Sequence, residues 1–316
     1  MLNDAHCHFF SSPLFAALAR QRTPAGSTST DIRATADALC GELQWDAPGT
    51  PEMLADRWIV ELDAHGVSRA ALIASIPGDE DSVGTAVARH PERLIGFFML
   101  DPAAADAAAR VRRATGELGL RVVCLFPAMH RVPLDDERTR EVVAAVAEQP
   151  GTAVFVHCGV LSVGVRRKLG LASRFDLRLG DPLGVARLAM EFPRLPFIIP
   201  HFGAGLFRET LMAADTCSNI HLDTSSSNGW MRYTPGLTLD AVLRTTLGVI
   251  GPSRLLFGTD SSFFPRGWQQ AVHDEQRRAV EGLGLSGSDE ALIFGGNFDR
   301  LFPPSNVGAG TPHPEP

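Results

Sequence analysis

"NDAHCHFF", residues 3–10, separates two architectures that the rest of this 316-residue chain allows. The stretch has the apolar start of a short strand, but no G-x-G-x-x-G turn follows it, so the fingerprint of a dinucleotide-binding fold is absent. It carries instead two histidines, His6 and His8. Residues two apart on a strand project from the same face, roughly 6–7 Å apart along it. Taken alone, the pair is a weak sign of a metal site, because a polar strand end that bonds to loop backbone has the same pattern.

Seven further apolar runs follow the first, and most of them lack the polar alternation of a half-buried strand. Uninterrupted apolar strands are typical of a parallel sheet that is covered on both faces. The eight predicted strands span residues 2–8, 69–76, 93–100, 120–127, 152–158, 196–201, 219–224 and 254–260. Helix-like stretches alternate with them, at 51–66, 101–119, 135–151, 181–193, 204–216, 237–249 and 268–282. This alternation predicts either an open doubly wound sheet or a closed (β/α)8 barrel.

Polar side chains recur at the carboxyl ends of these strands, from the first strand to the last. They are His6, His8, His157, His201, Asp223 and Asp260. A doubly wound sheet gathers its ligands at one switch point, whereas a barrel brings all its strand ends around one mouth. We therefore predict an α/β fold, a (β/α)8 TIM barrel that forms a single domain over residues 1–302.

Two long irregular stretches interrupt the alternation, at about 10–50 and 159–180. Both follow a strand, so we predict insertions after strands 1 and 5 that lie over the mouth of the barrel. The tail at 303–316 is rich in proline and glycine and is predicted to be disordered.

The composition excludes several classes of partner. The chain has 36 acidic against 29 basic residues, a formal charge of -7, which disfavours the basic face that nucleic acid requires. No apolar run reaches the roughly 18–20 residues of a membrane span. The five cysteines are irregularly spaced and form no C-x-x-C pair, as is typical of a reduced protein. We expect a soluble, cytoplasmic protein that binds a small molecule and neither nucleic acid nor membrane, and the sequence leaves a homodimer open.

Three further polar strand ends point to a site when taken together, although each one alone could equally be a hydrogen-bonded core residue. His157 ends a strand that is apolar on both faces, and the glycines after His201 in "PHFGAG" let a ligand approach the backbone closely. Asp260 ends "LLFGTD", where a carboxylate buried without a partner is costly. Together with the histidine pair, these residues predict a site for a divalent metal.

Four motifs, in this order, carry a family resemblance: "DAHCH", "FVHCG", "PHFGAG" and "FGTD". Over about residues 2–302 the chain resembles the amidohydrolase superfamily. More narrowly, it resembles the amidohydrolase-2 branch, which includes aminocarboxymuconate-semialdehyde decarboxylase and related decarboxylases, hydratases and lactonases. The stretches 62–72, 90–102 and 295–302 support the resemblance.

The resemblance implies a ligand set and a proton acceptor. The implied metal ligands are His6, His8, His157 and Asp260. His201 is implied to act beside the metal in acid–base chemistry, and His201 or Asp260 takes the proton of the activated water. We expect one divalent metal ion, zinc, with manganese as the alternative.

Members of the superfamily with two metals bridge them with a carboxylated lysine on the fourth strand. Here that strand reads "LRVVCLFP", with neither lysine nor glutamate, and the only lysine, Lys168, follows strand five. A single ion is therefore expected.

Residues in the predicted loops are candidate substrate contacts. The run 165–178 holds several arginines, and although a solvated basic loop is the default interpretation, such a loop over the mouth would clamp a substrate carboxylate. The stretches that follow strands four and seven reach the mouth in the same way. The candidates are His130, Arg166, Arg174, Asp223, Trp230 and Arg232.

Two reactions fit such a site. In the first, a metal-bound hydroxide hydrolyses an amide, ester or lactone carbonyl of a small carboxylate-bearing molecule. The second is non-oxidative decarboxylation of an aromatic or ene carboxylic acid on the same metal, which needs a cation to hold the carboxylate. Because no arginine in the first insertion stands out for that role, we favour hydrolysis. A metal-binding barrel without catalysis is disfavoured, since a structural site is closed and needs no additional base such as His201.

Overall fold

The computed structural model describes residues 1–22, 31–226 and 228–304, and it contains one sheet of eight parallel strands in the order β1 to β8. The strands are β1 (Asn3–Phe9), β2 (Arg69–Ala74), β3 (Leu94–Met99), β4 (Val122–Leu125), β5 (Ala153–Val156), β6 (Phe197–Ile199), β7 (Ile220–Asp223) and β8 (Leu255–Leu256). Backbone hydrogen bonds join the last strand region to the first: Ala5 N donates to Phe257 O at 2.9 Å, and Asp260 N donates to His6 O at 2.9 Å. The predicted (β/α)8 barrel is confirmed.

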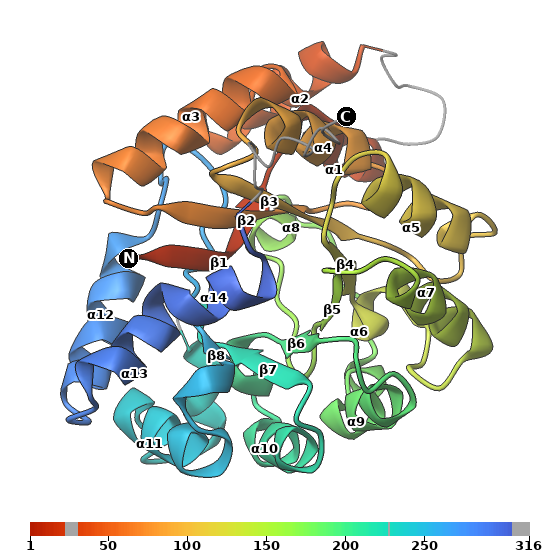
Figure 1. The fold of residues 1–316 in the computed structure, drawn as a ribbon. Helices are drawn as coiled ribbons and strands as arrows, with labels where there is room; N and C mark the ends of the chain where they lie inside the picture. The colour runs from red at the N-terminus through yellow and green to blue at the C-terminus, as the bar shows by residue number, and fades with distance from the viewer. Residues whose placement is uncertain (23–30, 227, 305–316) are drawn as a thin grey trace, which may run out of the picture.

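Helices surround the strands on the outside (Figure 1). The helices that alternate with the strands are α3 (Pro51–Ala64), α4 (Glu80–Arg89), α5 (Ala107–Gly116), α7 (Glu137–Ala147), α9 (Pro182–Glu191), α10 (Phe207–Thr216), α11 (Leu239–Ile250) and α12 (Gln270–Glu281). The first of them shows why the sequence signals worked. Thr50 accepts a hydrogen bond from Met53 N at 3.3 Å and Pro51 occupies the first turn of α3, where its missing N–H costs nothing.

The remaining elements are short or lie at the two ends of the barrel. They are α1 (Ser12–Arg22), α2 (Ile32–Leu43), α6 (Pro127–His130), α8 (Gly164–Lys168), η1 (Leu177–Leu179), η2 (His201–Gly203), η3 (Gly229–Tyr233), η4 (Pro252–Arg254), α13 (Gly287–Ala291), η5 (Leu292–Gly296) and α14 (Asn297–Leu301). No described helix is both long enough and apolar enough to cross a membrane.

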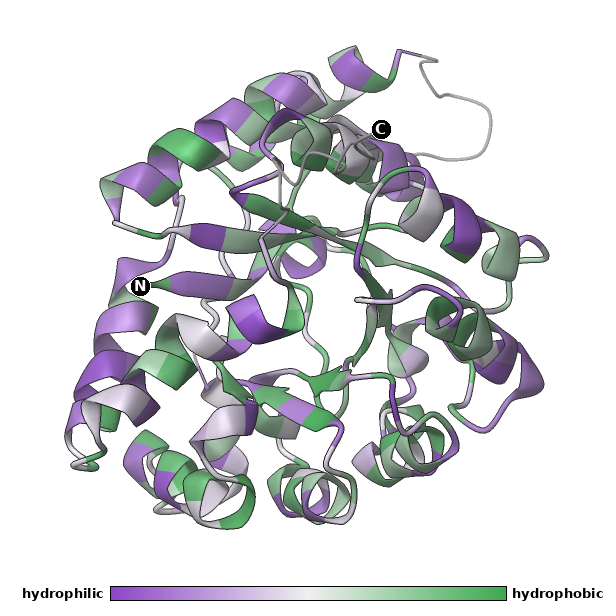
Figure 2. Cartoon of the chain, in the orientation of Figure 1, coloured by the Kyte–Doolittle hydropathy of each residue, from purple (hydrophilic) through white to green (hydrophobic). Residues whose placement is uncertain are grey.

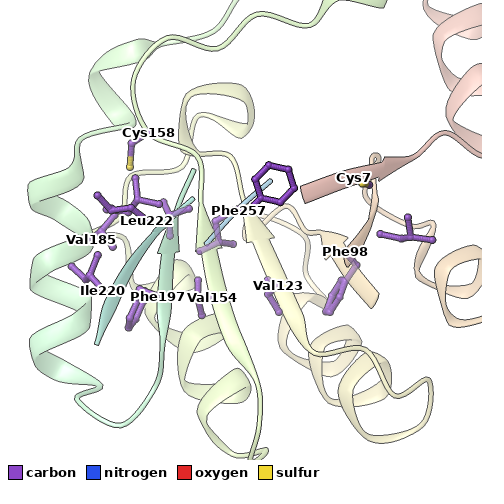
Figure 3. Close-up of a cluster of buried hydrophobic side chains, with 14 of the residues drawn as sticks. Cys7, Phe98, Val123, Val154, Cys158, Val185, Phe197, Ile220, Leu222 and Phe257 are labelled. Carbon is purple, nitrogen blue, oxygen red and sulfur yellow. The ribbon is translucent and has the colours of Figure 1, made fainter. Parts of the chain in front are cut away.

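Apolar side chains form two layers, one on each face of the sheet. The outer layer fills the space between strands and helices, and Figure 3 draws part of it, from Cys7 of β1 to Cys158 beyond β5. The inner layer fills the barrel and ends with Phe298 and Phe302, which plug the end opposite the polar strand ends. Figure 2 shows much of this pattern, with green segments on most strands and purple segments on the surrounding helices, while β1 is largely purple.

A third hydrophobic cluster connects the two predicted insertions. It consists of Leu14, Phe15, Leu18, Ala36, Leu39, Cys40, Trp45 and Val165, and we call it the cap cluster. Helices α1 and α2 follow β1, whereas Val165 belongs to α8 after β5, so the two insertions pack on each other.

The predicted boundary at residue 302 and the disordered tail at 303–316 stay predictions. Residues 305–316 lie outside the described part of the chain, and α14 ends one residue before the boundary, at Leu301.

Candidate metal centre

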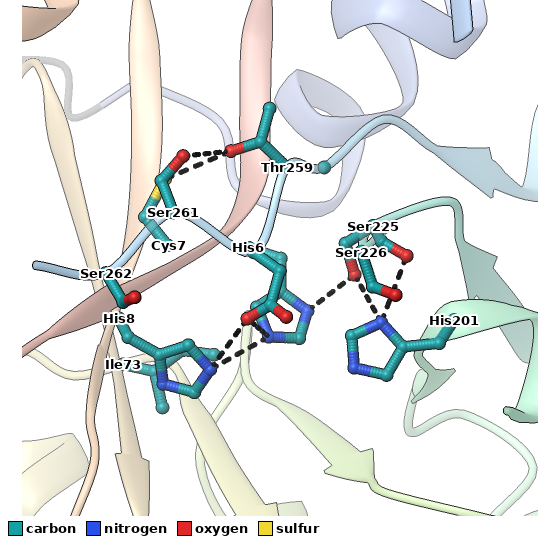
Figure 4. Close-up of polar contacts among 12 residues, drawn as sticks. His6, Cys7, His8, Ile73, His201, Ser225, Ser226, Thr259, Ser261 and Ser262 are labelled. Carbon is teal, nitrogen blue, oxygen red and sulfur yellow. Dashed lines mark hydrogen bonds and ion pairs between the residues drawn. The ribbon is translucent and has the colours of Figure 1, made fainter. Parts of the chain in front are cut away.

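A β-bulge in β1 aims the first two histidines. The pairing of β1 with β2 shifts between Asp4 and Cys7, so that one extra residue is accommodated there. Bulges of this kind redirect side chains next to sites. Cys7 consequently packs in the outer layer, while the rings of His6 and His8 lie inside the mouth with their Nε2 atoms 3.4 Å apart. Figure 4 shows the ring of His6 between those of His8 and His201.

Hydrogen bonds fix which ring nitrogen of His8 carries the proton. The Ser75 hydroxyl donates to Ile73 O at 3.0 Å, so its oxygen must accept from His8 Nδ1, which lies 2.8 Å away. Burial lowers the pKa of His8 despite the opposing contact with Asp260, which favours the neutral ring. In that ring Nε2 is a bare acceptor, directed at His6.

His6 is oriented in the same way by a carboxylate. Its Nδ1 lies 2.9 Å from Asp223 Oδ2, and a carboxylate oxygen can only accept, so Nδ1 donates. The remaining nitrogen, Nε2, points at His8 and lies 3.8 Å from Asp260 Oδ1. Burial acts against a charge on His6, but Asp223 and Asp260 outweigh it and raise the pKa of the ring. The negative charges of Asp223 and Asp260 therefore favour a positive charge at His6.

Asp260 completes a three-atom cluster. Its Oδ1 lies 3.1 Å from His8 Nε2. Burial would raise the pKa of this carboxyl, but the hydrogen bond and the positive charge that His8 supplies when it is protonated hold that pKa far below its usual range. The residue adopts a left-handed backbone, with φ 59°, four positions beyond the end of β8. Such backbone costs a non-glycine residue about 1–3 kcal/mol and is common at functional sites.

The spacing in this cluster fits a divalent ion. His6, His8 and Asp260 form one of the two described groups whose ligand atoms all lie close enough to share an ion. Ligands placed tetrahedrally at about 2.0–2.1 Å from zinc lie about 3.4 Å from each other. The observed separations of 3.1, 3.4 and 3.8 Å bracket that value. In the second group, His6, His201 and Asp223, the carboxylate already accepts from His6 Nδ1 and from the backbone N of His201, so we take the first group as the candidate centre.

Asp223 orients both neighbouring histidines. The carboxylate is fully buried and accepts from His6 Nδ1, from His201 N at 3.1 Å, and from the backbone and hydroxyl of Ser225. Burial alone would raise its pKa, but the charges of His6 and His201 lower it. Because Asp223 is fully buried and both of its oxygens already accept hydrogen bonds, its main role in the structure is to orient the histidines, and its contact with a substrate stays a prediction.

His201 sits on an unusual backbone. His201, Phe202 and Ala204 have φ of 56°, 52° and 43°, a left-handed run that turns the chain directly after β6. The turn is held from the side by Gly159, where a Cβ would lie 2.2 Å from Gly203 O. Packing of this closeness requires glycine at 159.

The ring of His201 is prepared as a proton acceptor. Its Nδ1 lies 3.1 Å from Ser225 O, a carbonyl that only accepts, so Nδ1 donates and Nε2 is bare. Burial, followed by the charge of His6, lowers the pKa of His201, so the ring is neutral near pH 7.

His157 lies outside both groups of converging ligand atoms. Its ring stacks on Phe126 at 5.4 Å between centroids and meets His201 edge-on at 5.3 Å. Nδ1 is buried without a hydrogen-bond partner, and burial together with His201 lowers the pKa of the ring to about 3. His157 is therefore a neutral imidazole whose Nδ1 has no hydrogen-bond partner among the described residues.

The predicted substrate contacts are more dispersed. Arg166 donates to Gln21 Oε1 at 2.6 Å and to Ala172 O at 2.7 Å, so it ties α8 to α1. Arg174 is exposed, and its backbone carbonyl accepts a hydrogen bond from the guanidinium of Arg131. Arg232 donates to the hydroxyl of its neighbour, Tyr233.

Two further predicted contacts lie against aromatic rings. Trp230 is buried in the outer layer between Phe202 and Phe207, which places it behind the His201 turn and not on an open surface. His130 meets Phe126 edge-on, and burial lowers the pKa of its ring. Of the two, His130 shares Phe126 with His157 and is the better placed.

Arg266 was missed in the sequence, although it follows Asp260 by only six residues. Its Nη2 donates to Ser262 Oγ at 2.7 Å and reaches Asp260 O at 3.4 Å. Ser75 and Ser225 were missed as well. A hydroxyl that stands two residues beyond a polar strand end, as Ser225 does after Asp223, is the signal that would have found it.

Comparison with known proteins identifies the family. Residues 4–303 match the amidohydrolase family, in its amidohydrolase-2 branch. The chain is 32% identical over 130 residues to 2-keto-4-carboxy-3-hexenedioate hydratase of Sphingobium sp. SYK-6, covering 37% of this chain and 36% of the hydratase. It is 25% identical over 146 residues to the protein fluG of Emericella nidulans, covering 44% of this chain and 15% of fluG. The matched part spans well under half of either curated relative.

Solved structures share the fold over nearly the whole chain. One is 5-carboxyvanillate decarboxylase of Sphingomonas paucimobilis, with a TM-score of 0.63, 20% identity, and coverage of 95% of this chain and 98% of that one. A second is a probable 2-pyrone-4,6-dicarboxylic acid hydrolase of Acinetobacter baumannii, with a TM-score of 0.56, 15% identity, and coverage of 95% and 98%.

Two neighbours hold metals. An amidohydrolase of Burkholderia multivorans with bound zinc has a TM-score of 0.60, 17% identity, and coverage of 95% of this chain and 98% of that one. The 5-carboxyvanillate decarboxylase of Novosphingobium aromaticivorans with bound manganese has a TM-score of 0.62, 17% identity, and coverage of 96% and 97%. Since the family match begins in the first strand and extends past α14, it takes in the whole barrel, and the chain belongs to the amidohydrolase family, in its amidohydrolase-2 branch.

Proposed function

We propose that this protein is a metal-dependent enzyme that activates water to hydrolyse an amide, ester or lactone carbonyl of a small, carboxylate-bearing molecule. The observation that carries the proposal is the convergence of His6 Nε2, His8 Nε2 and Asp260 Oδ1 within 3.1–3.8 Å. Three acceptors this close repel each other unless a positive charge lies among them, and partly buried imidazoles and carboxylates are the donors that divalent ions take.

His6, His8, Asp260 and His157 would hold one ion. The buried, unpartnered Nδ1 of His157 supports its inclusion, because an unsatisfied polar atom in the interior costs about 1–3 kcal/mol and a metal bond removes that cost. We infer zinc, with manganese as the alternative, since both occur in structures with this fold. One ion is favoured because β4 carries no lysine or glutamate that could bridge two.

When bound, a divalent ion lowers the pKa of its water to near neutrality and polarises a carbonyl. His201 is suited to receive the proton of that water at Nε2, because its Nδ1 is committed to Ser225. Asp260, which is ionised and 36% exposed, is the second acceptor at the mouth. Asp223 accepts from His6 Nδ1 and from the backbone N of His201, and in this way it fixes the positions of the two residues relative to each other.

The relatives support the substrate class. The hydratase, the decarboxylases and the pyrone hydrolase are all named for molecules with one or more carboxyl groups. We infer that the substrate of this chain is likewise a small carboxylic acid.

Non-oxidative decarboxylation of an aromatic or ene carboxylic acid is the second candidate. It is favoured by Arg266, which supplies beside Asp260 a cation of the kind that holds a carboxylate. In this reaction His201 would first accept a proton from water at Nε2 and then deliver it to the carbon that loses carbon dioxide, whereas in hydrolysis it would only accept the proton of the attacking water.

The deciding experiment is a pair of substrate panels on one preparation of known metal content. Lactones, esters and amides are followed by release of acid, and aromatic and ene carboxylic acids are followed by release of carbon dioxide. Turnover in the first panel supports hydrolysis, and turnover in the second supports decarboxylation. Full activity in preparations free of divalent metal would contradict both.

We also infer a reducing compartment, the cytoplasm. All five cysteines are free and buried, and none has a disulfide partner among the described residues. This is the pattern of a protein that folds without oxidation.

A further inference from the structure

Arg266 lies in the loop after β8, and its guanidinium contacts the backbone of Asp260, a residue of the candidate metal centre. Its Nη2 donates to Ser262 Oγ at 2.7 Å and reaches the carbonyl of Asp260 at 3.4 Å. Asp260 is the same residue whose carboxylate contacts His8. A group held near Arg266 is therefore also near the centre.

Arg266 forms no ion pair among the described residues, although the charge of Asp260 acts on it from a greater distance. No carboxylate of the described chain lies within ion-pair distance of it, whereas two other arginines with a similar aromatic contact are paired, Arg57 with Asp46 and Arg277 with Glu281. A guanidinium has five N–H donors, and only two bonds of Arg266 are formed. Since arginine stays protonated, the loop presents a fixed positive charge with free donors to the solvent side of the mouth.

An aromatic stack holds this guanidinium in place. Its Cζ lies 4.5 Å from the centroid of the Phe263 ring, and Phe263 stacks on Trp45 at 3.7 Å with an interplanar angle of 11°. Trp45 belongs to the cap cluster. A guanidinium stacked on a ring is pre-oriented for bidentate recognition of a carboxylate, which reduces the entropy lost on binding.

We infer that Arg266 binds a carboxylate of the substrate, one that is distinct from the group reacting at the metal. The inference rests on the proposed function and narrows it to substrates with a carboxylate beside the reacting group. The competing explanation is that Arg266 only braces the loop through Ser262 and Asp260. The two explanations make different predictions for the affinity of a ligand with a second carboxylate and for that of a ligand without it.

The test is the affinity of two probes measured by titration calorimetry. Isophthalate carries two carboxylates, and 3-carbamoylbenzoate has the same shape with one of them replaced by a neutral amide. Wild type should bind isophthalate about 10- to 100-fold more tightly, as expected for a charge-assisted hydrogen-bonded pair. R266Q should lose this preference while keeping its affinity for 3-carbamoylbenzoate, and R266K should retain part of it.

R277Q is the matched control, because Arg277 also stacks on a phenylalanine, 4.7 Å from the ring of Phe294, but lies on α12. It should bind both probes as wild type does. If R266Q weakens both probes equally, or changes neither, the inference is wrong and Arg266 is a bracing residue.

Metal content distinguishes this failure from failure of the proposed function. Elemental analysis of wild type and R266Q should give the same amount of divalent ion. A protein that holds no metal and turns over neither panel contradicts the proposed function, yet a charge preference abolished only by R266Q would still place the carboxylate at Arg266.

Discussion

His6 and His8 turn their Nε2 atoms toward each other at 3.4 Å, and each ring is fixed by its own Nδ1, which donates on the far side. Asp223 accepts from one ring and Ser75 from the other. Partners of this kind set the tautomer of a metal-binding histidine and strengthen its lone pair. The arrangement makes the pair a candidate for metal binding before any ion is present.

Removing the metal should abolish activity and lower stability together. Dialysis against a chelator should lower the melting temperature, because a ligand that binds only the folded state stabilises it. Zinc or manganese added back should restore both. A chelated protein with unchanged activity and melting temperature would contradict the proposed centre.

His201→Asn should retain the metal and lose turnover by about 10²- to 10⁴-fold, the usual contribution of a general base. Asparagine keeps a donor for Ser225 but has no ring nitrogen to accept a proton. The measurement is kcat beside metal content. Unchanged turnover would remove His201 from the mechanism.

Asp223→Asn should weaken metal affinity about 10- to 100-fold, the typical effect of a lost partner behind a ligand. The amide can present its NH₂ to His6 Nδ1, which would then have to flip its tautomer and lose the bare Nε2. Competition with a fluorescent zinc chelator measures the change. Asp215→Asn, on exposed α10, is the control and should leave affinity unaltered.

Asp79 should make stability fall as pH rises from about 4 to about 6. Burial, opposed by the hydroxyls of Ser11 and Ser82, raises the pKa of Asp79 to about 6 from 3.8. The folded state therefore keeps a proton that the unfolded chain releases in this window, and the effect amounts to at most about 3 kcal/mol. Above pH 6 both states are ionised and the dependence ends.

Urea unfolding of wild type and Asp79→Asn at pH 4.5 and pH 7 checks this. The variant should gain stability relative to wild type on going to pH 7, since it has no carboxylate to ionise. Asp81→Asn, an exposed neighbour paired with Arg113, should show no such gain. A wild type that gains stability relative to Asp79→Asn at pH 7 would contradict the assignment.

The barrel was predictable because most of its strands are apolar on both faces and because four of the alternating helices, α3, α7, α9 and α11, follow a capping threonine or aspartate. The exact geometry of the site was not. Asp260 was predicted at a strand end, yet β8 stops at Leu256, and the left-handed backbone at 260 brings the carboxylate to His8. No residue pattern announces such a turn at an aspartate.

Two other features depend on contacts between distant segments. The role of Asp223 follows from its four donors, which come from β1 and from the turns after β6 and β7. Arg266 escaped notice because a single arginine in an aromatic loop has no periodicity to mark it. Only the fold shows that its charge is unpaired and that it adjoins Asp260.

The stack of Trp45 on Phe263 has an evolutionary consequence. It joins the insertion after β1 to the loop that carries Arg266. Substitutions in this insertion can thus shift the guanidinium that we propose binds an anion, while the histidines and the aspartate at the strand ends stay unchanged. The substrate selectivity of such an enzyme can therefore change through residues of the cap cluster, and two proteins with the same histidine pair need not share a substrate.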